Sequence, residues 1–100
     1  MSQKPETAFR AKAYRWIDLN LPGCWYESIQ QVAIRGTPDT FMCLRGRFVA
    51  LEWKADESSP ATEMQKLKLE RINAAGGIGL IVHPQNWEQV QKILLGLRGH

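Results

Sequence analysis

The alternation of hydrophobic and polar residues predicts a β-hairpin in the middle of the chain. Residues 40–54 alternate with a period of two on either side of a tight turn at Arg45-Gly46. One face of this hairpin carries the apolar side chains of Phe41, Cys43, Phe48 and Ala50. Further strands are predicted at residues 25–32 and 78–82, and the second of these is apolar enough for a buried central position.

Hydrophobic residues three and four positions apart predict helices before and after this hairpin. The first spans residues 5–20, the second runs from Pro60 to Ala75 with Ser59 as its N-cap, and the third follows Asn86. The order helix, three strands, helix, strand, helix is typical of an α/β sandwich. In such a fold, helices flank a mixed sheet, here of about four strands.

Two carboxylates are predicted to lie opposite each other at the open end of the hairpin. With a two-residue turn, counting outward along both strands pairs Asp39 with Glu52. Like charges in such a pair are destabilising unless positive charge lies between them. Lys54 supplies part of that charge, and a divalent cation such as Mg²⁺, which binds carboxylate oxygens, would supply the rest. The alternative is that Pro38-Asp39 is only a turn and that Glu52 and Lys54 lie on a solvated strand edge.

Other polar residues are candidates for the same site. Glu6, in the first turn of the first helix, either reaches the site or only stabilises the positive end of the helix dipole. Gln65 lies among apolar neighbours, so its amide needs hydrogen-bond partners at the site or in a nearby loop. Arg35, beside Gly36, and Lys68 are the candidate contacts to DNA phosphates, and the alternative for Arg35 is a solvated surface charge.

Composition and charge limit the possible functions. One hundred residues correspond to a single domain over residues 1–100, and a chain this short could gain stability by pairing with a second copy. The net charge of +3 weakly favours a polyanionic partner. No apolar run is long enough to span a membrane, and no signal-peptide pattern is found at the start. Cys24 and Cys43 are expected to be reduced core residues of a cytoplasmic protein.

Pro38-Asp39 followed by Glu52-Trp53-Lys54 resembles the signature of the PD-(D/E)XK nuclease superfamily. The order of Glu6, residues 36–39, residues 52–54 and Gln65 is similar to that of the VRR-NUC branch, the virus-type replication-repair nucleases. The resemblance extends over nearly the entire chain. It implies a restriction-endonuclease-like sandwich with the element order given above.

The resemblance also implies a metal-dependent endonuclease that hydrolyses the phosphodiester bonds of DNA with Mg²⁺ or Mn²⁺. Asp39 and Glu52 would bind the metal together with the backbone carbonyl of Trp53. Glu6 would complete the ligand set directly or through water. Lys54 would orient or deprotonate the attacking water and contact the phosphate.

Gln65, by the same resemblance, would position Lys54 or the water. The implied substrate is branched or Holliday-junction DNA in replication, repair or recombination, cut by a homodimer in a bacterial or phage-infected cytoplasm. Two other functions fit the same chain: a non-catalytic nucleic-acid-binding module of this fold, and an assembly protein without metal affinity. The pair Asp39 and Glu52 favours the enzyme, because a pure binder gains nothing from two acids near phosphate.

Overall fold

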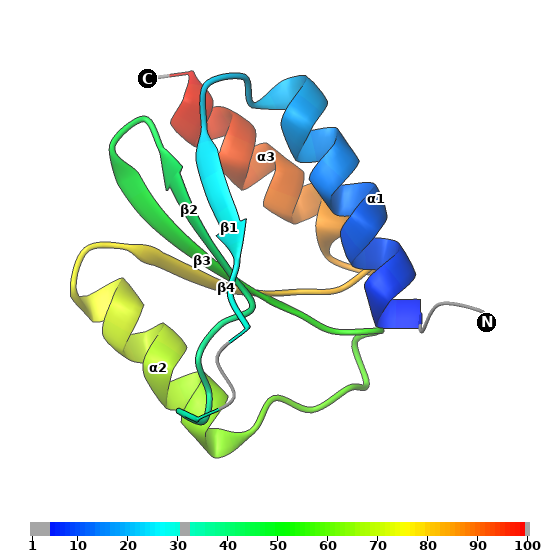
Figure 1. The fold of residues 1–100 in the computed structure, drawn as a ribbon, viewed down its shortest axis with the longest axis vertical. Helices are drawn as coiled ribbons and strands as arrows, with labels where there is room; N and C mark the ends of the chain where they lie inside the picture. Colours follow the sequence, from blue (N-terminus) through cyan, green and yellow to red (C-terminus); the bar gives the residue numbers. More distant parts are fainter. Residues whose placement is uncertain (1–4, 31–32, 100) are drawn as a thin grey trace.

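Residues 5–30 and 33–99 are described by the computed structural model, and they form a four-stranded mixed sheet with three helices (Figure 1). In chain order the elements are α1 (Pro5–Asn20), β1 (Trp25–Ser28), β2 (Thr40–Leu44), β3 (Arg47–Trp53), α2 (Glu63–Ala74), β4 (Ile78–Val82) and α3 (Trp87–Arg98). The strand order is β1-β2-β3-β4, with β4 parallel to β3 and the other pairs antiparallel. The predicted α/β fold class and element order are confirmed. Strand β1 ends before the predicted residue 32, although residues 31–32 lie outside the described part.

The main hydrophobic core lies between the sheet and the pair of helices α1 and α3, while α2 lies against the other face (Figure 1). The buried residues of this core are Ala13, Ile17, Leu21, Met42, Leu44, Val49, Leu51, Trp53, Val82, Val90 and Leu94. In β2 and β3 they alternate with the residues that were expected to carry the apolar load of the hairpin. That expected face is only partly covered, because Cys43 and Phe48 are exposed.

The exposure of Cys43 corrects the prediction that both cysteines are core residues. Cys43 lies on the open face of β2, whereas Cys24 is half-buried, and both are free thiols. The residues on either side of Cys43 in β2 are buried, so the predicted period of two is confirmed. The face that was predicted to point into the core was the wrong one.

Among the described residues, no helix is long and apolar enough to cross a membrane.

The β2–β3 hairpin has the predicted register. The turn residues Arg45 and Gly46 have φ angles of 54° and 81°, as a two-residue hairpin turn requires. At the other end the paired ladder finishes with Thr40 opposite Leu51. Asp39 and Glu52 are the next residues outward, so the register brings them to the same end of the sheet.

Helix α2 begins at Glu63 and not at the predicted Pro60, and its N-cap is Thr62. The predicted N-cap, Ser59, instead donates a hydrogen bond from its hydroxyl to Asp56 in the preceding loop, at 3.4 Å. Thr62 is the better cap because the residue three positions later completes a reciprocal capping box with it.

Strand β4 was predicted to be central, but it lies at the edge of the described sheet. The side-chain amide of Asn73 accepts from the backbone N–H of Gly79 at 2.9 Å and donates to its carbonyl at 3.3 Å. Asn86 donates from its amide to the carbonyl of Ile81 at 2.9 Å. These amides bind backbone groups that a neighbouring strand would otherwise take, which explains how so apolar a strand can lie at an edge.

The loop before β2 is packed directly against α2. Gly36 has a φ of +80°, and a Cβ atom added there would lie 2.7 Å from the backbone carbonyl carbon of Met64. Next to it, Lys68 donates from Nζ to the hydroxyl of Thr37 at 3.3 Å. A glycine is therefore required both by the conformation and by the close approach to the helix.

Replacing Gly36 by alanine should destabilise the fold more than the same change at Gly23. Gly23 also has a positive φ, of +87°, but an added Cβ would contact nothing within 4 Å. Gly23→Ala should cost roughly 1–2 kcal/mol for the left-handed backbone alone. Gly36→Ala should cost roughly 1–3 kcal/mol more for overlap with the helix. Urea denaturation of the two variants measures the difference, and equal losses would show that the loop does not depend on this contact.

Candidate active site

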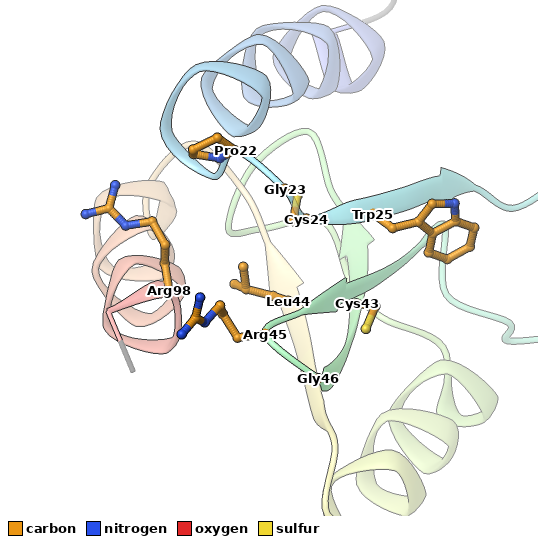
Figure 2. A pocket seen from close by; sticks show the side chains of 9 residues that line it. All are labelled: Pro22, Gly23, Cys24, Trp25, Cys43, Leu44, Arg45, Gly46 and Arg98. Carbon is orange, nitrogen blue, oxygen red and sulfur yellow. The ribbon is translucent and has the colours of Figure 1, made fainter.

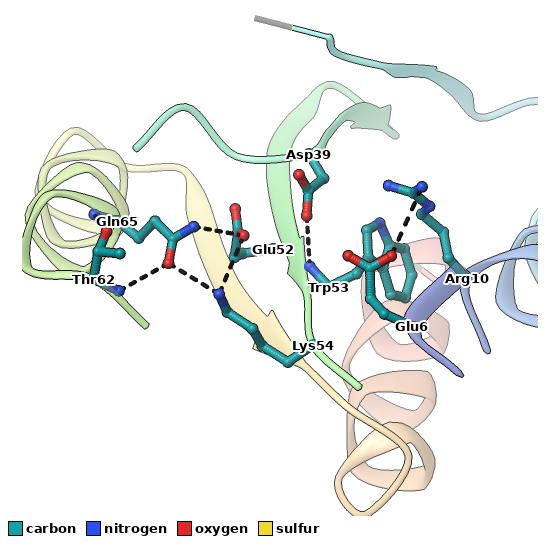
Figure 3. Close-up of polar contacts among 8 residues, drawn as sticks. All are labelled: Glu6, Arg10, Asp39, Glu52, Trp53, Lys54, Thr62 and Gln65. Carbon is teal, nitrogen blue, oxygen red and sulfur yellow. Dashed lines mark hydrogen bonds and ion pairs between the residues drawn. The ribbon is translucent and has the colours of Figure 1, made fainter. Parts of the chain in front are cut away.

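Asp39 and Glu52 meet where β3 ends and the chain leaves the sheet toward α2 (Figure 3). Asp39 directly precedes β2, and its Oδ2 accepts a hydrogen bond from the backbone N–H of Trp53 at 3.0 Å. This bond adds one contact, made through a side chain, beyond the last backbone pair of β2 and β3. It fixes the Asp39 carboxylate beside the β3 backbone. One oxygen of Asp39 is thereby used to hold its position.

Glu52 is a buried carboxylate whose hydrogen bonds are incomplete. It is 4% exposed, and its Oε2 accepts from Nε2 of Gln65 at 2.9 Å and lies 3.7 Å from Nζ of Lys54. Its Oε1 is buried and has no hydrogen-bond partner among the described residues. A buried carboxylate oxygen without a donor is costly, and a cation held by Glu52 and Asp39 would remove that cost. The residues present therefore fit a divalent metal such as Mg²⁺ or Mn²⁺.

The pKa of Glu52 reflects the same conflict. Burial raises it, the negative charge of Asp39 raises it further, and the positive charge of Lys54 only partly offsets both. The resulting pKa of Glu52 is about 7, compared with an ordinary value of 4.5. In the absence of a cation, Glu52 is therefore mostly protonated below about pH 7, where an ordinary glutamate would already carry a negative charge.

Lys54 and Gln65 form one hydrogen-bonded group with Glu52. Lys54 donates from Nζ to Oε1 of Gln65 at 3.0 Å, and the same oxygen accepts from the backbone N–H of Thr62 at 2.9 Å. Gln65 donates from its amide nitrogen to Glu52, so one side chain links the strand residues to the start of α2 (Figure 3). The structure thus brings together four of the predicted site residues: Asp39, Glu52, Lys54 and Gln65.

Glu6 is at the same end of the molecule but makes a different contact. In Figure 3 it is drawn over the indole of Trp53 and next to Arg10, away from Lys54 and Gln65. Its carboxylate forms an ion pair with Arg10 at 3.8 Å. Among the described residues no three His, Cys, Asp or Glu side chains are close enough to hold one metal. A role for Glu6 as a metal ligand remains a prediction.

The two predicted DNA contacts have different surroundings. Arg35 is exposed in the loop before Gly36. Lys68 is half-buried on α2, three residues after Gln65, and its hydrogen bond to Thr37 ties that loop to the helix. Lys68 therefore has a structural role in addition to any contact with phosphate.

Trp53 is hydrogen-bonded to Thr40, a buried polar residue that the sequence analysis did not identify. The indole Nε1 donates to the hydroxyl of Thr40 at 2.9 Å, and that hydroxyl is also hydrogen-bonded to the hydroxyl of Tyr14 at 2.5 Å. The rings of Phe9, Tyr14 and Trp87 pack around the indole. These contacts fix the end of β3 and with it the backbone carbonyl proposed as a metal ligand. In the sequence, the only signal for Thr40 was its position at the end of a strand with alternating polarity.

A separate hollow lies at the opposite end of the hairpin, around the Arg45-Gly46 turn (Figure 2). Both cysteines line it, together with Arg45 and Arg98. Arg98 donates to the backbone carbonyl of Asn20 at 3.0 Å and so joins the ends of α3 and α1. None of the described residues that line this hollow carries a carboxylate, so they do not offer an acid pair like the one at the other end of β3.

Comparison with known proteins supports the fold. A solved structure described as a VRR_NUC domain superposes with a TM-score of 0.75 and 22% sequence identity, covering 92% of this chain and 96% of that one. The predicted resemblance is therefore confirmed for the fold. No protein-family model matches the sequence, and no curated protein matches it significantly.

The raised pKa of Glu52 predicts how stability of the metal-free protein depends on pH. Between about pH 4.5 and pH 7 the folded state holds a proton on Glu52 that the unfolded state has released. This group therefore lowers the free energy of unfolding as the pH rises through that window. Denaturation curves of wild type and Glu52→Gln across this range should show that the variant lacks this loss. Parallel pH profiles for the two proteins would contradict the raised pKa.

Proposed function

We propose that this chain is a metal-dependent endonuclease that hydrolyses phosphodiester bonds in DNA. The observation that carries the proposal is the buried Glu52, whose Oε1 has no partner among the described residues and which lies beside Asp39. Two acids forced together in this way lower the stability of the folded chain unless they bind a cation. The VRR_NUC domain of the same fold adds support, because its name denotes a nuclease.

Mg²⁺ or Mn²⁺ would be held by Asp39, Glu52 and the backbone carbonyl of Trp53, and Glu6 would contribute directly or through water. The bound cation supplies positive charge that stabilises the developing negative charge on the scissile phosphate. Asp39 is oriented for this by its bond to the N–H of Trp53. The carbonyl of Trp53 is held in place by the buried indole ring.

Lys54 is the proposed contact to the attacking water and to the phosphate oxygens. Gln65 accepts one of its three N–H donors, and the carboxylate of Glu52 lies close to the same ammonium group. These contacts hold the lysine at the metal site while leaving donor capacity for water and substrate. Gln65 thus positions Lys54, and Arg35 and Lys68 would contact phosphates outside the reacting bond.

Asp39→Ala and Glu52→Ala should each reduce Mg²⁺-dependent cleavage of DNA to background, because each removes a carboxylate that binds the metal. Both variants should remain folded, since relieving the opposed charges costs little. Glu63→Ala is a matched control, because the Glu63 side chain is 95% exposed on α2 and contacts Lys66. Supercoiled plasmid incubated with each purified protein, with and without Mg²⁺ or Mn²⁺, measures the effect. Wild-type cleavage rates in either acid variant would remove that residue from the site.

We further propose that the substrate is branched DNA, cut by a homodimer in replication, repair or recombination. Two copies related by a two-fold axis would present two active sites at a fixed separation, which suits a four-way junction. The part of the sheet face that α2 leaves uncovered offers apolar surface for a second copy, since Trp25 is 55% exposed and Phe48 42% exposed. Arg35 and Lys68 are proposed to contact phosphates, and phosphate contacts carry no sequence information, so base preference should be low.

The homodimer predicts preferential, paired cutting of four-way junctions over linear duplex of the same sequence. Sedimentation equilibrium gives the oligomeric state, and end-labelled junctions show whether opposed strands are cut symmetrically. Phe48→Ser should weaken the dimer and reduce junction cutting while leaving the acid pair intact. A monomer that cuts linear and four-way DNA equally would refute the junction-selective dimer and leave a general nuclease.

A further inference from the structure

The side chain of Gln65 belongs to two structures at once, a helix cap and the candidate active site. Within the cap, the backbone N–H of Gln65 donates to the hydroxyl of Thr62 at 3.1 Å, and Oε1 of Gln65 accepts from the N–H of Thr62 at 2.9 Å. Within the site, that same oxygen accepts from Lys54 at 3.0 Å, and Nε2 donates to Glu52 at 2.9 Å.

Three of these four hydrogen bonds involve the side-chain amide of Gln65, and they leave it only one orientation. The backbone N–H of Thr62 and the ammonium of Lys54 are donors without acceptor capacity, so the group facing them must be an oxygen. Two donors occupy both lone pairs of that oxygen. The nitrogen must then face Glu52, whose Oε2 accepts from it.

We propose that Thr62 is a positioning residue of the active site, acting through the capping box that orients the amide of Gln65 toward Lys54 and Glu52. The inference rests on the proposed function in assigning catalytic roles to Lys54 and Glu52. It does not rest on that function for the coupling itself, which is a property of the metal-free protein. Any movement of the α2 N-terminus would be transmitted to the lysine through one side chain.

The double role of residue 65 in the cap and in the site explains why it is glutamine and not glutamate. At this third helical position glutamate completes a capping box as well as glutamine does. A glutamate here would keep the bonds from Thr62 and Lys54 but would place a third carboxylate against Glu52 and remove the donor that Glu52 receives. The cap alone accepts either residue, whereas the cap and the site together require the amide.

Nuclear magnetic resonance of the metal-free protein tests the coupling without any need for activity. Thr62→Val keeps the side-chain shape but removes the hydroxyl. In this variant the chemical shifts of the side-chain NH₂ group of Gln65 should change and move toward those of a glutamine side chain without a fixed orientation. Thr62→Ser restores the hydroxyl and should restore the signals. Asn73→Ala is the matched control, because it removes two hydrogen bonds from the other end of α2 without touching the capping box. Unchanged Gln65 signals in Thr62→Val, or equal changes in Asn73→Ala, would overturn the inference.

Kinetics test the consequence for catalysis. Thr62→Val should lower kcat about tenfold, which is the effect of about 1.4 kcal/mol on the barrier, with little change in KM, and Thr62→Ser should recover most of it. Because Thr62 acts through Gln65, the double variant Thr62→Val/Gln65→Ala should be no slower than Gln65→Ala alone. Additive losses would show that Thr62 acts only on helix stability. Absence of cleavage by the wild type would refute the proposed nuclease while leaving the resonance test of the coupling intact.

Discussion

The enforced proximity of Asp39 and Glu52 is the constraint on which the rest of the site depends. The hairpin register sets it, because a ladder ending at Thr40 and Leu51 leaves the two acids as the next residues outward. Burial removes water from the Glu52 carboxylate, the charge of Asp39 adds to this effect, and together they raise the pKa of Glu52 to about 7. Such an arrangement lowers the stability of the metal-free chain, and the proposed metal ion, which needs both charges, would offset that cost.

The surrounding residues hold the pair in place from two directions. On the core side, the indole of Trp53 is hydrogen-bonded to Thr40 and packed by aromatic rings, and these contacts hold the end of β3 in place. On the other side, Gln65 connects Glu52 and Lys54 to the first turn of α2. The site is thus built mostly on a strand and a helix, which suits groups that must be placed to within fractions of an ångström.

Much of this arrangement could be predicted from the sequence, because the hairpin rests on local signals. The period of two, the short turn and the spacing of the acids place Asp39, Glu52 and Lys54 together without knowledge of the remaining chain. The N-cap of α2 was missed although its signal is local. Ser59-Pro60 looked like a helix start, but Ser59 is bound to Asp56 instead.

Other features depend on contacts between distant residues and could not be predicted. The edge position of β4 relies on the side chains of Asn73 and Asn86, which replace a neighbouring strand. The choice of inner face in the hairpin depends on where α1 and α3 pack, and periodicity alone does not give this. The burial of Glu52, and hence its raised pKa, likewise follows from the assembled fold.

Direct titration of metal into the protein tests the central claim that the acid pair is a cation site. Mn²⁺ should be titrated calorimetrically at pH 8, where Glu52 is ionised, into wild type, Lys54→Ala and the double variant Asp39→Asn/Glu52→Gln. The account predicts saturable binding by wild type and Lys54→Ala and none by the double variant. Binding by the double variant with wild-type affinity, or no binding by the wild type, would contradict it.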